Sequence, residues 1–208
     1  SRLDTRTGAW ELFDNTNSIM HEPWCYAVTA DSGTVYTAGW GGGVLVRDPQ
    51  TGRLREHRHP TGLMELSLVK DDGLIHDITT AVAHSRGVLW VGTYFGLSRF
   101  DGRRWRNYTQ ADSGLAGDFI NFLRAKGDAV WIATDQGLGR FDSKTWRTWR
   151  KKTDGPGFEL ESTDEKGSRS VEALAAGPAC NEVYSVDIDR KGDAWVATAA
   201  GLSHGVAR

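Results

Sequence analysis

One segment of this chain is repeated. The stretch GVLWVGTYFGLSRFDGRRWRNY, Gly87 to Tyr108, recurs almost in step as DAVWIATDQGLGRFDSKTWRTW, Asp128 to Trp149. Two fainter copies are TVYTAGWGGGVLVRD, from Thr34, and DAWVATAAGLSHG, from Asp193. A chain built from copies of one unit buries its core by stacking those units, so the repeat constrains the fold more than any other feature. The copies align on one aromatic residue each: Tyr36, Trp90, Trp131 and Trp195.

Each copy indicates four short strands. In the second copy they are expected at 78–83, 88–93, 97–100 and 105–108, and Asp101-Gly102 between the last two is a strong hairpin signal. The 25 glycines fit a chain with many tight turns. Four antiparallel strands in about 40 residues are typical of a β-propeller blade.

We therefore expect an all-β fold, a small β-propeller of about four blades forming a single domain over 1–208. The blades are predicted at 19–59, 75–110, 115–150 and 179–208, with an insertion at 151–177.

Two arrangements of the ends follow from the sequence. Residues 1–14 place Trp10 where the second copy has Trp105, so they could form a closing strand that completes the last blade. Alternatively the chain is a segment of a longer propeller, because residues 1–4 also resemble a third strand.

The insertion mixes both charge signs with Gly-Pro-Gly. Residues 170–176 (SVEALAA) have helical character, and Gly177 is placed to cap a helix. Because a loop of this length is usually functional or disordered, we expect a lid or arm that contacts a partner, or else a plain surface excursion.

The repeats resemble the two-component regulator propeller, whose pattern is an aromatic, a small pair, Gly-Leu and then an aromatic-Asp turn. Segments 73–78 (GLIHDI) and 114–119 (GLAGDF) match the family's approach to a first strand, whereas the first copy departs with Gly42-Gly43-Val44 in place of Gly-Leu. Such repeats occur mainly in periplasmic sensor regions of bacterial receptors and in secreted or cell-surface proteins. The resemblance implies a binding architecture and an extracellular or periplasmic location, and it carries no catalytic motif.

The two cysteines bear on ring closure. Cys25 and Cys180 precede or begin the first strands of the first and last blades. In a closed ring of four these blades are neighbours, so a disulfide could staple them. Two buried free thiols are the alternative.

Candidate binding residues lie in the loops between second and third strands, which share a face with the connections between blades. Trp40, Tyr94 and Phe95 could stack on a sugar or a peptide, or simply cover the blade ends. Asp135 and Gln136 occupy the corresponding loop of the third blade. A second set precedes the first strands: Glu22, His76, Asp77, Asp118 and Glu182. Its acids could coordinate Ca²⁺ or receive a basic partner, or bond backbone amides.

Composition excludes some functions. The net charge of −2 gives no footprint for nucleic acid, and no apolar run approaches the ~18 residues of a membrane helix. No Cys-x-x-Cys-His occurs, which excludes covalent haem attachment within this chain, and no Gly-x-Ser-x-Gly or phosphate loop occurs either. We expect no cofactor, with Ca²⁺ at the acidic residues as the alternative.

We therefore expect a non-enzymatic binding or scaffolding propeller that engages a protein or a glycan within a larger assembly. The alternatives are a lyase or hydrolase using His76 with Asp77 and Asp118, or the sensor region of a larger bacterial receptor. The sequence leaves the oligomeric state open.

Overall fold

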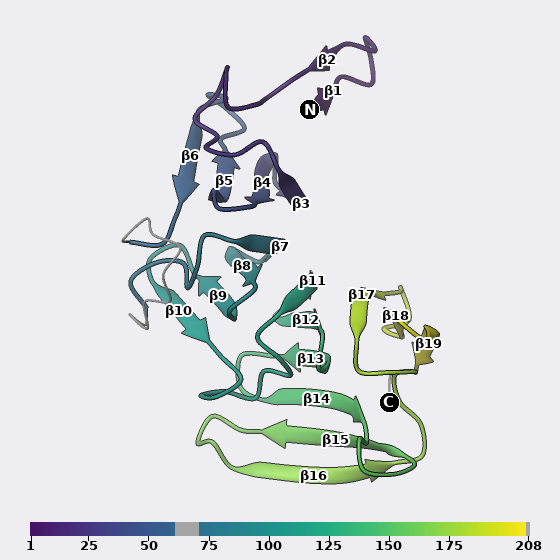
Figure 1. The fold of residues 1–208 in the computed structure, drawn as a ribbon. Helices are drawn as coiled ribbons and strands as arrows, with labels where there is room; N and C mark the ends of the chain where they lie inside the picture. Colours follow the sequence, from purple (N-terminus) through teal and green to yellow (C-terminus); the bar gives the residue numbers. More distant parts are fainter. Residues whose placement is uncertain (61–70, 207–208) are drawn as a thin grey trace.

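The computed structural model describes residues 1–60 and 71–206, and these residues form strands without any helix. Four sheets follow one another along the chain as blades, and every strand pair is antiparallel (Figure 1). Blade 1 comprises β3 (Cys25–Asp31), β4 (Thr34–Gly39), β5 (Gly43–Arg47) and β6 (Leu54–His57). Blade 2 comprises β7 (Thr79–Ser85), β8 (Val88–Thr93), β9 (Leu97–Phe100) and β10 (Trp105–Tyr108). The all-β class and the four blades are confirmed, as are the strands expected in the second copy.

The last two blades depart from the four-strand pattern in opposite ways. Blade 3 has six strands: β11 (Ile120–Lys126), β12 (Ala129–Thr134), β13 (Gly137–Phe141), β14 (Trp146–Lys151), β15 (Phe158–Thr163) and β16 (Arg169–Leu174). Blade 4 has three: β17 (Val183–Ile188), β18 (Ala194–Thr198) and β19 (Gly201–Gly205).

The insertion is therefore a hairpin on the outer edge of blade 3, which corrects two predictions. The expected helix at 170–176 is wrong, because β16 pairs with β15 over six residue pairs, from Phe158↔Leu174 to Thr163↔Arg169. This ladder satisfies the backbone groups that a short helix would leave unpaired at its ends. Gly177 does not cap a helix but lies under the ring of Phe158. The insertion is likewise part of a sheet and not a free lid or arm.

The first strand of every blade carries a β-bulge at the same place. The register shifts at the residues Tyr26, Thr80, Asn121 and Tyr184. Two of these side chains bond the next blade: Thr80 Oγ1 donates to the carbonyl of Ile120, and Asn121 Nδ2 donates to the carbonyl of Val183 at 2.8 Å. A bulge re-aims a side chain, and here it directs polar groups across the joint between blades.

Each pair of consecutive blades encloses its own hydrophobic core. Val44, Val46, Val82 and Val91 lie between blades 1 and 2. The joint between blades 2 and 3 is built around the repeated tryptophans, with Trp90 packed on Phe141 and Trp146 stacked on the same ring at 4.2 Å. Val183, Val186 and Val196 pack between blades 3 and 4. The blades are therefore held as a linear series.

The two ends of this series do not meet in the structure. Figure 1 shows an open arc with the N-terminal hairpin and blade 1 at one end and blade 4 at the other. The predicted closing strand is wrong for this structure: β2 (Trp10–Glu11) pairs with β1 (Arg2–Leu3), and the described part of blade 4 has no fourth strand. A neighbouring strand joined by a short turn is available to β2 without any long-range closure.

The predicted disulfide is also wrong. Cys25 and Cys180 are both free thiols, since blades 1 and 4 lie at opposite ends of the arc instead of side by side. Burial raises the pKa of the Cys25 thiol.

Candidate binding face

The loops between second and third strands adjoin the residues that precede the first strands. In three blades an amide of this loop donates a hydrogen bond to the carbonyl of the residue immediately before the first strand of the same blade. The pairs are Trp40 to Trp24 at 2.9 Å, Asp135 to Phe119 at 3.3 Å and Ala199 to Glu182 at 3.0 Å. The same bond in three blades follows from the repeat itself. It brings both sets of candidate residues to one end of the blades, which we call the loop face.

An aromatic row crosses this face over three blades; its members are Tyr26, Trp40, Tyr94 and Phe119. Ring centroids are 5.9 Å apart for Tyr26–Trp40, 5.2 Å for Trp40–Tyr94 and 4.2 Å for Tyr94–Phe119. The last pair is stacked and the middle pair meets edge to face, both favourable geometries for aromatic rings. Tyr26 is 54% exposed, while Trp40 and Tyr94 are half-buried. The row therefore joins blades together and also offers ring surface to solvent.

Sequence reasoning identified Trp40 and Tyr94 but missed the two outer members of the row. Tyr26 occupies the bulge of β3, and Phe119 immediately precedes β11. The repeat could have pointed to both residues, because it predicts where each blade begins and both lie at the start of a first strand. Phe95, the third predicted aromatic, turns inward, and its ring centroid lies 4.4 Å from that of His76.

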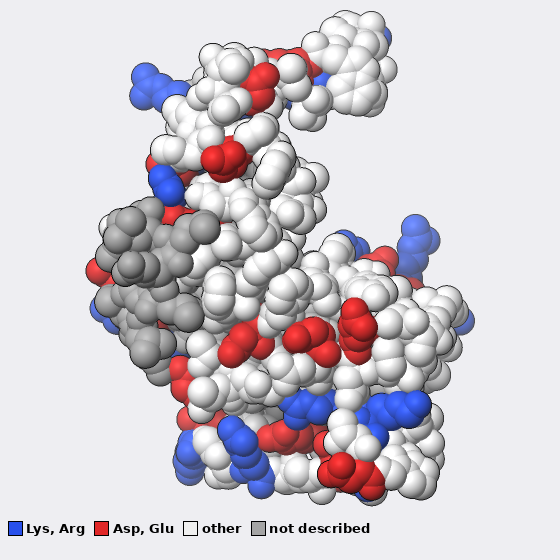
Figure 2. All heavy atoms as spheres, in the orientation of Figure 1, with Lys and Arg blue, Asp and Glu red and all other residues white. Residues whose placement is uncertain are grey.

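Three carboxylates continue the loop face into blades 3 and 4, and we call Asp118, Asp135 and Glu182 the acidic strip. Burial raises the pKa of Asp135, with Asp118 and Glu182 adding repulsion; burial also raises the pKa of Asp118, and Asp112 adds to it. Among the described residues no lysine or arginine forms an ion pair with any of the three. Figure 2 shows acidic side chains in a row across one side of the molecule.

Two predicted site residues lie inside the protein. His76 and Asp77 are each 1% exposed. The Asp77 carboxylate accepts a hydrogen bond from the amide of His59 at 2.6 Å and pairs with Arg58 at 3.2 Å, while His76 Nδ1 accepts the amide of Ile78 at 3.0 Å. Both side chains therefore support the connection between blades 1 and 2. The proposed catalytic group of His76, Asp77 and Asp118 does not assemble at the surface.

The first strands enclose a hollow of about 510 Å³ along the inside of the arc, lined by 26–30, 80–84 and 121–125. No Asp or Glu is among the described residues that line it. Within 1–60 and 71–206, no three His, Cys, Asp or Glu side chains are grouped as a metal would require. The same residues contain no helix suited to crossing a membrane.

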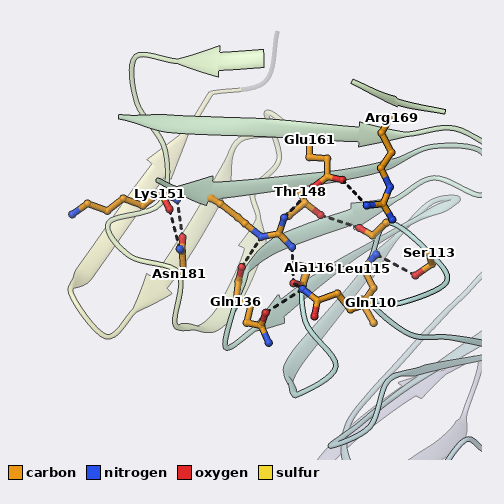
Figure 3. Close-up of polar contacts among 12 residues, drawn as sticks. Gln110, Ser113, Leu115, Ala116, Gln136, Thr148, Lys151, Glu161, Arg169 and Asn181 are labelled. Carbon is orange, nitrogen blue, oxygen red and sulfur yellow. Dashed lines mark hydrogen bonds and ion pairs between the residues drawn. The ribbon is translucent and has the colours of Figure 1, made fainter. Parts of the chain in front are cut away.

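Arg150 at the end of β14 fixes the acidic end of the loop face. It donates to the carbonyls of Ala116 at 2.7 Å and Gln136 at 2.9 Å, and to Glu161 of β15 at 3.0 Å. Figure 3 shows this network, in which Gln136 also meets Gln110 and Glu161 also meets Arg169. A guanidinium bonded to three groups holds their relative positions rigidly. The hairpin of blade 3 thus supports the loop that carries Asp135 and Gln136.

No family model matches the sequence, and no curated protein matches it significantly. The fold is similar to the extracellular domain of the hybrid two-component system BT3049 from B. thetaiotaomicron, with a TM-score of 0.54 and 16% identity over 98% of this chain. This chain spans 30% of the length of that one. It is also similar to the computationally designed Ika4 protein, with a TM-score of 0.55 and 13% identity over 92% of this chain and 96% of the other. These likenesses concern the fold: the chain is a four-bladed β-propeller, in agreement with the resemblance of its repeats to the two-component regulator propeller.

Proposed function

We propose that this chain is a non-enzymatic binding module that engages a protein or glycan partner through its loop face. One observation carries the proposal: the aromatic row extends across three blades and leaves ring surface open at Tyr26. Exposed rings in a fixed array stack on sugar faces and on other aromatic rings, and they attract basic side chains through cation–π contacts. Because the rings are already held in place, binding costs little conformational freedom.

The acidic strip defines the chemistry at the other end of the face. Among the described residues these carboxylates have no lysine or arginine partner, and such carboxylates favour ligands that donate hydrogen bonds or carry positive charge. A glycan would offer hydroxyl donors, and a protein segment would offer Lys or Arg. The likeness to an extracellular domain supports an extracellular or periplasmic location, with this chain as one part of a larger assembly.

The test is a screen of the purified chain against an immobilised glycan array and a displayed peptide library, followed by calorimetry of the best binder. Tyr26→Ala is the informative variant because the side chain is 54% exposed and its loss leaves the blade cores intact. We expect at least about a tenfold weaker Kd. Val171→Ala, at a 65% exposed position on β16, is the matched control and should bind normally.

Two results would count against the proposal. Unchanged affinity of Tyr26→Ala for every binder would remove the aromatic row from the interface. Cleavage of a bound oligosaccharide during prolonged incubation would favour the lyase or hydrolase alternative instead.

A further inference from the structure

The outer edge of blade 3 differs from that of blade 2. In blade 2 the outermost strand is β10, which has four residues, and the Asp71 carboxylate accepts a hydrogen bond from its Asn107 amide at 2.9 Å. In blade 3 the added hairpin moves the edge outward to β16, which has six residues and forms the outer rim of the arc in Figure 1. Blade 3 is an internal blade, because blade 2 packs on one of its faces and blade 4 on the other.

The backbone of β16 presents hydrogen-bonding groups along this edge. Alternate residues of an antiparallel strand direct their N–H and C=O groups to opposite sides. In the turn between β15 and β16, the amide of Asp164 donates to the carbonyl of Ser168 at 3.1 Å. Counting on from that pair, every second residue of β16 bonds β15, and Arg169, Val171 and Ala173 turn their backbone groups outward. Among the described residues no partner for these outward amides and carbonyls is found.

The strand β16 also lacks the features that usually protect an exposed edge. Its register with β15 runs without a shift over all six residue pairs, and it contains no Pro and no Lys. Its central valine, Val171, is 65% exposed. Proteins block exposed edges with bulges, Pro, Lys or a covering segment, because a regular edge readily pairs with another strand. The edge of β16 therefore has the form of one that receives a strand.

We propose that β16 pairs with β16 of a second copy of this chain, antiparallel and around a two-fold axis at Val171. In this register Val171 lies opposite its counterpart, and Arg169 of each copy lies opposite Ala173 of the other. All three outward-facing residues of each strand thus exchange backbone hydrogen bonds with the other copy. The contact joins the two blades into one continuous sheet. Because the two-fold axis uses both edges, association stops at two copies.

Charge complementarity on one face of the sheet favours a second copy as the occupant. Arg169 would cross the small Ala173 of the other copy toward Glu159, which pairs with Ala173 in β15. Neighbouring strands lie about 4.8 Å apart, so the Cα atoms of Arg169 and Glu159 would be about 10 Å apart, within the combined reach of both side chains. Glu159 is half-buried and forms no ion pair among the described residues. The present ion pair of Arg169 with Glu161 is 3.6 Å long and its arginine side chain is 56% exposed, so exchanging it costs little.

The other face of the strand is complementary to itself as well. Ser170 would lie opposite Glu172 of the second copy, where its hydroxyl can donate to the carboxylate, and the same contact occurs twice. At the axis the two exposed Val171 side chains would cover each other. No two like charges lie directly opposite each other in this register, so one short sequence supplies both halves of the contact.

The first test measures association by sedimentation equilibrium of the purified chain. Two paired strands make a small interface, so we expect a dimer dissociation constant of about 10–100 μM. Val171→Pro removes an amide that points outward, so the ladder with β15 should persist, as circular dichroism would verify, while the dissociation constant rises at least about tenfold. Val171→Thr keeps the amide and the branched side chain and should still dimerise. A wild-type chain that stays monomeric at about 500 μM, or a Val171→Pro variant that dimerises like the wild type, would overturn the proposal.

The second test reads the register of the contact. In a background with Cys25→Ser and Cys180→Ser, one protein carries Ser170→Cys and another carries Glu172→Cys. In the proposed register these positions face each other without direct backbone bonds, with Cα atoms about 4.5 Å apart, a distance that a disulfide can bridge. Mild oxidation of the mixture should therefore give more covalent heterodimer than either homodimer on a non-reducing gel. A prevailing homodimer of either variant would indicate a shifted register and refute the pairing around Val171, and the absence of any cross-linked species would refute the contact.

Discussion

Gly92 offers a direct test of the packing between blades 2 and 3. A Cβ atom at this position would lie 2.5 Å from Ile120 Cγ2 and 3.0 Å from Ile120 Cβ, with Ala81 Cβ at 3.2 Å. Carbon atoms at optimal contact are about 3.5–4.0 Å apart, so Gly92→Ala must push β11 away from β8. The other blades hold alanine at this position, as at Ala38 and Ala133, so the conflict arises from Ile120 and not from the repeat.

The expected cost can be worked out from two opposing effects. Overpacking a core by one methyl group costs about 1–3 kcal/mol, and replacing a strand glycine returns about 0.4–1 kcal/mol through the unfolded chain. The net loss is then roughly 0–2.6 kcal/mol, or a fall in Tm of up to about 10 °C for a chain of this length. Calorimetry of Gly92→Ala would measure it.

Gly139→Ala is the matched control. Its Cβ would lie 3.5 Å from Ile132 Cβ, an ordinary contact, so this variant should be as stable as the wild type or slightly more stable. Adding Ile120→Ala removes the atom at 2.5 Å, and in that background Gly92→Ala should lose most of its cost. Equal stability of Gly92→Ala and Gly139→Ala in the wild-type background would refute the reasoning.

Two further predictions concern polar groups. Thr79 is fully buried; its hydroxyl accepts a hydrogen bond from the amide of Gly39 at 2.8 Å and donates one to the carbonyl of Gly43 at 2.7 Å. Thr79→Val should therefore lower the free energy of unfolding, measured in urea, by about 1–3 kcal/mol. An unchanged urea midpoint would show that these bonds between blades add nothing to stability. Asp118 has a pKa raised above 3.8 by burial, so its charge disfavours the folded state as pH rises through that pKa. Asp118→Asn keeps an oxygen to accept the Gln110 amide and should be more stable than the wild type at pH 7, with the difference vanishing near pH 3; a difference independent of pH would contradict this.

The repeat predicted the blades well because each blade is a local structure. Four strands joined by tight turns need only neighbouring residues, and the strands at 88–93, 97–100 and 105–108 lie where the pattern places them. Trp90 and Trp131 mark equivalent positions of blades 2 and 3 for the same reason.

The errors concern properties that local pattern does not contain. Helical character at 170–176 yielded to a ladder with β15, a tertiary partner invisible in that segment. His76 and Asp77 precede a first strand as expected, but both are buried: the Asp77 carboxylate bonds Arg58 and His59 from the end of blade 1, and the His76 ring packs on Phe95. The predicted disulfide required blades 1 and 4 to be neighbours. Their relative position depends on the angles at all three joints between blades, and no single repeat determines it.

The serial packing of the blades determines how the molecule should come apart. Within residues 1–60 and 71–206, blades 2 and 3 each pack against two blades, whereas blades 1 and 4 each pack against one. In such a one-dimensional series stability is a sum over units and the joints between them, so the terminal units unfold at the lowest free energy. Amide hydrogens of β3 and β17 should exchange with solvent faster than those of β7 and β11, even though all four strands share one sequence pattern and one bulge. Protection against exchange would thus record the position of a blade in the arc more faithfully than its sequence does.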